Sequence, residues 1–229
     1  MIKTEFQLLA MFDPRLAPHA TSAQPTWLWS SDGKHILWAN PPGTATFGAA
    51  DAAALARKTF GPADQHRRQV AQLASRLPLS GAPRLERLRG FGARLGVLMT
   101  CRCARLDFPD GSHGVLLNAI ETFARTMPLD ERLQRLIEGQ EQAVAAFALD
   151  GRLVGASSAA QPLLGEIAEA DLDAARHRAL ERGHVELSTS AGQLVMQRIG
   201  SGADTGLLAL ITPRFAQRVP AAEAATCAT

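Results

Sequence analysis

The stretch WSSDGKHILWAN, residues 29–40, is repeated in plan by FALDGRLVGASS, residues 147–158. Each holds a run of strand-forming residues, an Asp-Gly pair, a basic residue, a second apolar run and a small polar residue. An Asp-Gly pair between apolar runs is a strong signal of a tight β-hairpin, because glycine tolerates a positive φ. The two stretches therefore predict a chain built from two similar halves.

The segments that follow each hairpin keep the same order in both halves. A short helix of small residues ends in glycine, a longer helical region comes next, and three strands follow, the last two joined in a second hairpin. The longer helical region covers 51–77 in the first half and is shortened to 168–183 in the second. Strands at both ends of a helical middle predict an α+β fold with two mostly antiparallel five-stranded sheets, each with helices on one face.

Charge and composition exclude several classes of partner and location. The chain has 24 basic and 22 acidic residues and no block of five like charges, so we expect neither nucleic acid nor a charged membrane surface as a partner. No apolar run reaches the roughly 18 residues that a membrane span requires. Three cysteines without the spacing of a disulfide framework favour a reducing compartment, and we expect a cytoplasmic protein.

Both halves resemble PAS domains, whose first hairpin carries an Asp-Gly turn followed by an asparagine and a small-residue helix that ends in glycine. In the first half the matching positions are Asp32, Gly33, Asn40, Phe47 and Gly48. In the second half they are Asp150, Gly151 and Gly165, with Ser157 or Ser158 in place of the asparagine. No single motif is specific, and the resemblance depends on the ordered pattern occurring twice.

The resemblance implies a layout of five segments. These are an N-terminal helix or cap over 1–21, a PAS domain over 22–124, a linker helix over 125–139, a shortened PAS domain over 140–213 and a tail over 214–229 that leads to an output domain.

Tandem PAS modules most often precede kinase cores, so the resemblance implies a non-catalytic signal-sensing and dimerisation module of a two-component sensor histidine kinase. The parent protein would then be a phosphotransferase whose kinase domain is a partner of this region. We recognise no hydrolase elbow, paired-carboxylate pattern or kinase nucleotide motif, and we expect no catalytic residue in this chain. Two alternatives stay open: a haem- or flavin-binding redox or gas sensor, and a stand-alone PAS adaptor that recruits other signalling proteins.

The first half supplies the candidates for a ligand pocket. They are Trp29, Trp38, Asn40, Phe47, Phe60 and His66. Pockets favour aromatic linings. The resemblance implies that one face of the sheet lines the pocket and the other serves dimerisation, so we expect Trp38 to face the helices and Trp27 to face away from them, toward a partner.

Cofactor and metal candidates are few. His66 lies roughly where haem-binding PAS domains carry their proximal histidine, and this leaves haem open. The segment NPPGTATFG, residues 40–48, lacks the cysteine of flavin-linking PAS domains. Cys101 and Cys103 share one face of a predicted strand, but a structural zinc needs two more ligands, so we expect no metal site.

The segment MPLDERLQRLIEGQ, residues 127–140, predicts an amphipathic linker helix. Its apolar stripe is formed by Leu129, Leu133, Leu136 and Ile137. At coiled-coil spacing, the stripe fits either a helix packed on its own domain or a seam between two chains. The N-terminal stretch that contains Leu8 is likewise amphipathic, and the two segments together predict a parallel homodimer.

Overall fold

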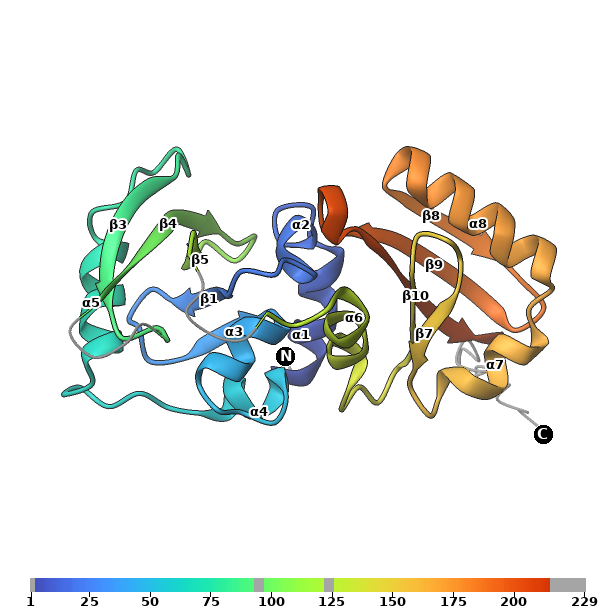
Figure 1. Ribbon diagram of the computed structural model, residues 1–229, viewed down its shortest axis with the longest axis horizontal. Coiled ribbons are helices and arrows are strands. Elements are labelled where there is room, and N and C mark those ends of the chain that lie inside the picture. Colours follow the sequence, from blue (N-terminus) through green and yellow to red (C-terminus); the bar gives the residue numbers. More distant parts are fainter. Residues whose placement is uncertain (1–2, 93–96, 122–125, 215–229) are drawn as a thin grey trace, which may run out of the picture.

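The computed structural model describes residues 3–92, 97–121 and 126–214. It holds two five-stranded sheets whose paired strands are all antiparallel, so the predicted α+β class with two such sheets is confirmed. We call each sheet together with the helices inserted between its strands a unit (Figure 1). Cys227 and all but the first residue of the predicted tail lie outside the described residues.

The first unit has the strand order β2-β1-β5-β4-β3. Its strands are β1 (Thr26–Ser30), β2 (Ile36–Ala39), β3 (Arg84–Arg89), β4 (Leu98–Asp107) and β5 (His113–Ala119). Its helices are α3 (Pro41–Thr46), α4 (Ala52–Arg57) and α5 (Gln65–Ala74).

The second unit has the strand order β7-β6-β10-β9-β8, which matches the first sheet strand for strand. Its strands are β6 (Ala143–Phe147), β7 (Leu153–Ala156), β8 (His184–Ser188), β9 (Gly192–Ile199) and β10 (Gly206–Pro213). Its helices are α7 (Ala160–Glu166) and α8 (Glu169–Arg182), and a 3₁₀ turn, η1 (Gly202–Asp204), precedes β10. The repeat in the sequence is therefore a repeat of topology.

Each unit's first hairpin turns at its Asp-Gly pair, as the sequence predicts. Oδ1 of Asp32 accepts a hydrogen bond from the Lys34 amide at 3.0 Å, and Asp150 accepts from the amide two residues further on in the second unit. Gly33 has a φ of +66°, and a side chain there would run into the backbone of Arg67. Glycine is therefore required at this turn both by its φ and by the close approach of α5.

Asn40 closes the first hairpin from the inside. Its Oδ1 accepts hydrogen bonds from the amides of Thr26 and Gly43, each at 2.9 Å. Its Nδ2 donates to the carbonyls of His19 and Gln24, at 3.1 and 2.8 Å. The side chain is fully buried, so it joins β1, the start of α3 and the segment before β1 into one hydrogen-bonded unit.

Ser157 holds the same place in the second unit. Its Oγ accepts from the amides of Val144 and Ala160, at 3.0 and 3.3 Å, and donates to the Gln142 carbonyl at 2.7 Å. Of the two serines that match the PAS asparagine in the sequence, Ser157 is thus the structural equivalent of Asn40.

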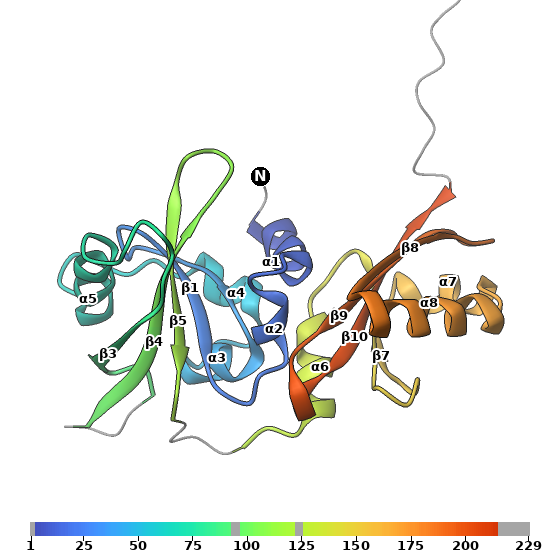
Figure 2. The same cartoon turned by 90° about the horizontal axis from the view of Figure 1, so that it is seen from above.

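Within each unit the inserted helices pack on the outer face of the sheet, and helices from the predicted N-terminal cap and linker cover the inner faces as well. The inner faces of the sheets are turned toward each other with three helices between them: α1 (Lys3–Phe12), α2 (Ala17–Ala20) and α6 (Leu129–Ile137) (Figure 2). We call these helices the shared helical layer. They are required because the inner faces are apolar as well, and an apolar sheet face must be buried against another element.

One hydrophobic core runs through the shared helical layer and joins both units. The first sheet contributes Leu28, Trp38, Leu106 and Leu116, and the second contributes Val144, Ala146, Ile199 and Leu208. The two sheets are therefore packed through the same helices and share their inner core.

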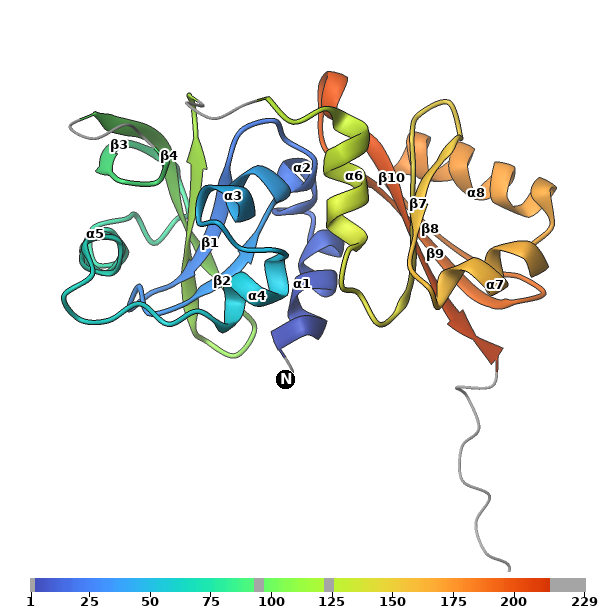
Figure 3. The ribbon, with the colours of Figure 1, turned by 60° about the horizontal axis from the view of Figure 1, so that its bottom comes forward.

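Helix α6 lies between the two sheets (Figure 3), and the predicted apolar stripe of this linker is buried within a single chain. Leu133 is fully buried, Leu136 and Ile137 are each 7% exposed, and Leu129 packs against the same core. Leu8 of α1 is also buried there. Of the two interpretations of this stripe, packing within the chain is the one observed, so these residues are not available as a seam in this conformation. The homodimer remains a prediction.

We expect Leu133→Ala to lower the free energy of unfolding of the whole chain by about 2–5 kcal/mol, because it removes a fully buried side chain from the core shared by both units. Denaturant unfolding should be followed by tryptophan fluorescence, which reports the first unit, and by far-ultraviolet circular dichroism, which reports both. Leu153→Ala, at a site 48% exposed, is the control and should cost less than about 0.5 kcal/mol. A variant in which only one signal moves would show that the units do not depend on a common core.

Candidate functional site

Six rings gather on the outer face of the first sheet, and we call them the aromatic cluster. They are Trp27, Trp29, Phe47, Phe60, Phe91 and the imidazole of His66. Ring centroids lie between 4.7 Å, for Trp29 and Phe60, and 6.2 Å, for Phe47 and Phe91, mostly edge to face. Such pairs are each favourable beyond the area that they bury. Four of the predicted pocket residues, Trp29, Phe47, Phe60 and His66, are thus brought together.

Local backbone geometry explains how the cluster is assembled. Trp27 and Trp29 are two apart on β1, so both side chains point to the same face. Phe60 lies near the hairpin because its amide donates to the Lys34 carbonyl at 2.9 Å. Phe91 follows β3 with a φ of +52°, a left-handed conformation that is uncommon outside glycine and turns its ring back under the sheet.

The two indole N–H groups of the cluster differ in their partners. Nε1 of Trp27 donates to the Gly43 carbonyl at 2.8 Å. Nε1 of Trp29 is buried and has no hydrogen-bond partner among the described residues. A buried unpaired donor costs about 1–3 kcal/mol, so Trp29 marks a position inside the cluster where an acceptor atom would be stabilised.

His66 has partners at both ring nitrogens. Nδ1 lies 3.0 Å from Oδ1 of Asp64, and Nε2 lies 3.4 Å from the amide nitrogen of Phe91. This arrangement assigns the proton to Nδ1, which donates to Asp64, while Nε2 accepts from Phe91. Burial opposes ionisation of Asp64, but hydrogen bonds from the amide and ring of His66 hold the pKa of that carboxyl below its usual value. A haem iron at Nε2 would have to displace the Phe91 amide, so the geometry does not favour haem.

Lys58 places its ammonium group over the cluster. Its Nζ lies 5.8 Å from the ring centroid of Phe47 and 5.4 Å from that of Phe60. Both distances are within the range of cation–π attraction. The cluster is therefore bordered by a positive charge next to two of its rings.

Trp38 and Asn40 are not part of this cluster. Trp38 pairs with Leu28 across the hairpin, so it points to the opposite face from Trp27 and Trp29 and is buried against the shared helical layer. The prediction that Trp38 faces the outer helices and Trp27 faces away was wrong, because cross-strand partners share a face while neighbours on a strand alternate. Asn40 acts instead as the hydrogen-bonded closure of the hairpin.

The cysteines and metal ligands offer no second centre within the described part of the chain. Cys101 and Cys103 are free and buried, and burial raises the pKa of Cys101 to about 12 and shifts that of Cys103 upward as well. Such thiols carry almost no thiolate at neutral pH. The described residues contain no group of three or more side chains placed to bind a metal. Nor do they form a helix that is both long enough and apolar enough to cross a membrane.

Alanines make up about half of the buried outer core of the second unit. Its buried residues include Ala143, Ala145, Ala175 and Ala179, and Phe147 is the aromatic residue among them. The shortened helical region brings α8 close to the sheet, and the small residues allow that approach. The equivalent of the aromatic cluster is therefore replaced by close helix–sheet packing.

Sequence reasoning missed two features of the site. Phe91 is not among the predicted pocket residues, although its position between Gly90 and Gly92 indicates a turn that re-aims a side chain. Arg132 falls on the apolar stripe of the linker, three residues after Leu129, and a charge at a buried stripe position is a signal of a specific partner.

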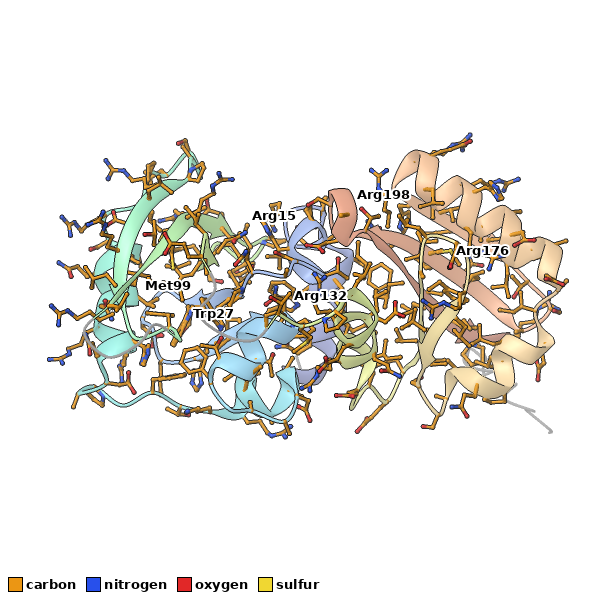
Figure 4. The ribbon with its side chains drawn as sticks, in the orientation of Figure 1. Arg15, Trp27, Met99, Arg132, Arg176 and Arg198 are labelled. Atoms are coloured by element: carbon orange, nitrogen blue, oxygen red, sulfur yellow. The ribbon has the colours of Figure 1, made fainter. Side chains whose placement is uncertain are left out.

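That partner is Asp204 in η1. Nη2 of Arg132 lies 2.8 Å from Oδ1 of Asp204, and Nη1 donates to the Thr21 carbonyl. The hydrogen bond from the guanidinium holds the pKa of Asp204 below its usual value. Oδ2 of Asp204 accepts from the Ala23 amide at 3.2 Å. Arg132 lies between the two sheets, where it joins α6, the second unit and the segment before β1 (Figure 4).

Comparison with known proteins gives no family. No protein-family model and no curated protein matches the chain. Among solved structures it is similar to an extracellular ligand-binding receptor from Desulfohalobium retbaense, at 16% identity and a TM-score of 0.24, over 81% of this chain and 29% of the receptor chain. The chain thus spans less than a third of that receptor.

Two further solved structures align over more of their own length. The E. coli DhaR(N)–DhaL complex aligns at 15% identity and a TM-score of 0.31, over 93% of this chain and 86% of that one. The sensory domain of the Campylobacter jejuni chemoreceptor Tlp3 with isoleucine bound aligns at 11% identity and a TM-score of 0.25, over 88% and 71%. All of these TM-scores lie below 0.5, so no function is transferred from these proteins.

We expect Trp27→Phe to lower the free energy of unfolding by about 1 kcal/mol more than Trp29→Phe. Both substitutions remove a similar volume from the aromatic cluster, but only the first breaks a hydrogen bond and leaves the Gly43 carbonyl without its donor. Urea titration of the two variants measures the difference. Equal losses would mean that the indole of Trp29 is as well satisfied as that of Trp27.

Gly90→Ala should destabilise the chain more than Gly48→Ala. Both glycines have positive φ, +82° and +64°, which costs alanine about 1–2 kcal/mol. Only at Gly90 would the added methyl group lie 2.5 Å from Nε2 of His66, whereas nothing lies within 4 Å at Gly48. Thermal unfolding in a His66→Ala background provides the control, because there the two substitutions should cost the same. If the excess cost persisted in that background, it would not arise from contact with His66.

Proposed function

We propose that the chain is a non-catalytic signal-sensing module made of two PAS-like units, in which the first unit receives the signal and the shared helical layer passes it to the second. The observation that carries the proposal is the buried N–H of Trp29, which has no acceptor among the described residues although it lies within the aromatic cluster. A small apolar molecule with one hydrogen-bond acceptor would satisfy this donor.

The route to the second unit follows the buried contacts around Arg132. A ligand at Trp29 acts on β1, and the segment that leads into β1 contains Thr21 and Ala23, which contact Arg132 and Asp204 respectively. Asp204 lies directly before β10, the central strand of the second sheet. A displacement of β1 would therefore change the packing at the centre of the other sheet. This requires that the arrangements of β1 before and after the displacement differ in their affinity for the ligand.

The wider setting of this module is also part of the proposal. By the resemblance to PAS domains, the output partner is a histidine kinase core, and the working form is a homodimer. The free thiols of Cys101 and Cys103 support a reducing, cytoplasmic location. The site residues proposed for sensing are Trp29, Phe47, Phe60 and His66.

A thermal-shift screen with small apolar acceptors, followed by hydrogen–deuterium exchange, tests the proposal. We expect a stabilising compound to increase protection in β1 and also to change exchange in α6 and in β10. The shift should be lost in Trp29→Phe and kept in Trp38→Phe, since Trp38 lies on the opposite face of the same hairpin. Native mass spectrometry of the purified chain reports any bound compound and the oligomeric state together.

Two outcomes would contradict the proposal. If a compound stabilises the Trp29→Phe variant as strongly as it stabilises the natural chain, that compound does not bind through the indole N–H of Trp29. A compound whose protection stays within the first unit is bound but not coupled to the second. An absorption band above about 400 nm in the purified protein would instead support the haem or flavin alternative.

A further inference from the structure

A small cavity of about 20 Å³ lies on the opposite side of the first hairpin from the aromatic cluster. Residues from α1, β2, α3, the start of α4 and the end of α6 form its walls. Its volume accommodates one group the size of a water molecule or an ammonium nitrogen. Because Trp38 forms part of the wall and faces away from Trp29, the cavity is separate from the proposed sensing site.

Three residues of the wall each carry a buried side-chain oxygen that has no hydrogen-bond partner among the described residues. These oxygens are Oε1 of Gln7, Oγ1 of Thr44 and Oε1 of Gln140. Gln7 is 2% exposed and Thr44 is 6% exposed, so water outside the protein does not satisfy them. The Gln7 amide is oriented by its nitrogen, which donates to the Leu37 carbonyl and leaves the oxygen as the unpaired atom.

The charges at the cavity favour a cation. Asp51 lines the wall and its Oδ1 caps α4 by accepting from the Ala54 amide at 2.6 Å. Arg135 also lines the wall, but its guanidinium is paired with Glu131 of the same helix at 2.9 Å. The wall thus retains the negative charge of Asp51, and the end of α6 adds the negative partial charge of a helix C-terminus.

We propose that this cavity binds an ammonium group, either the ammonium ion or the –NH₃⁺ end of a small primary amine. Three unpaired oxygens match the three N–H donors of a primary ammonium group. Apart from the charged Asp51 and Arg135, the wall also contains the apolar residues Met11, Trp38, Pro41 and Leu136, and the ring of Trp38 adds a surface that attracts cations. A potassium or sodium ion would find fewer oxygens here than such ions usually take.

Thermal unfolding in chloride salts at constant ionic strength tests the assignment directly on the full chain. Ammonium or methylammonium should raise the unfolding midpoint in a saturable manner, as expected for a ligand that binds only the folded state. Potassium and tetramethylammonium carry the same charge without N–H donors and should have no such effect. A response to both ammonium and methylammonium assigns a primary amine, and a response to ammonium alone assigns the free ion.

Two variants locate the binding. Thr44→Val removes one acceptor at nearly constant volume and should weaken the affinity for methylammonium or ammonium about tenfold. Gln142→Met is the matched control, because the oxygen of Gln142 is equally buried and unpaired but Gln142 is not part of the cavity wall. If Thr44→Val does not fold, Gln140→Met replaces it, and ¹⁵N-labelled ammonium added to the natural chain should give a resonance distinct from that of the free ion.

The proposal is overturned if potassium or tetramethylammonium stabilises the chain as much as ammonium does, or if Thr44→Val leaves the affinity unchanged. If neither ammonium nor methylammonium gives a saturable response, and no resonance of bound ¹⁵N-ammonium is seen, the cavity holds water only. None of these results bears on the coupling proposed for Trp29, because the probes carry donors rather than an acceptor and the two sites lie on opposite faces of the hairpin.

Discussion

The guanidinium of Arg132 lies between the two sheets with its side chain 5% exposed, and the relation of the two units depends on its contacts. It pairs with Asp204 of the second unit and donates to the Thr21 carbonyl ahead of the first sheet. Both terminal nitrogens of the guanidinium are thus hydrogen-bonded, while its Nε is buried without a partner among the described residues. Removing one partner of a buried ion pair typically costs about 3–5 kcal/mol. The pair therefore links α6 to the second unit and to the segment before β1, in addition to the apolar contacts of the shared core.

The shared helical layer is the consequence of two sheets with two apolar faces each. Outer faces are covered by helices within each unit, and inner faces remain to be buried. Three helices that precede or separate the units in the chain bury both inner faces at once. This arrangement stabilises each unit through the other and makes the helices between them the physical route for any change in packing.

The two candidate sites lie on opposite faces of one hairpin and differ in chemistry. The aromatic cluster offers an unpaired donor at Trp29, and the cavity near α6 offers three unpaired acceptors. Both sites are connected to the shared helical layer. The aromatic cluster is connected through β1 and the segment before it, and the cavity is lined by residues of α1 and α6 themselves. The second unit, with its alanine-rich outer core, has kept the topology but replaced the aromatic cluster by close packing.

The sequence by itself determined the repeat, the two antiparallel sheets, the Asp-Gly hairpins and the linker helix, because these follow from local periodicity and from the φ that a turn residue can adopt. It also singled out Trp29, Phe47, Phe60 and His66, which the fold brings together. Only the tertiary structure decided which face Trp38 points to, because that depends on the cross-strand register. It also decided which helices cover the inner faces of the sheets. The contact between Arg132 and Asp204 joins residues 72 positions apart, and no local pattern encodes a pairing of that range.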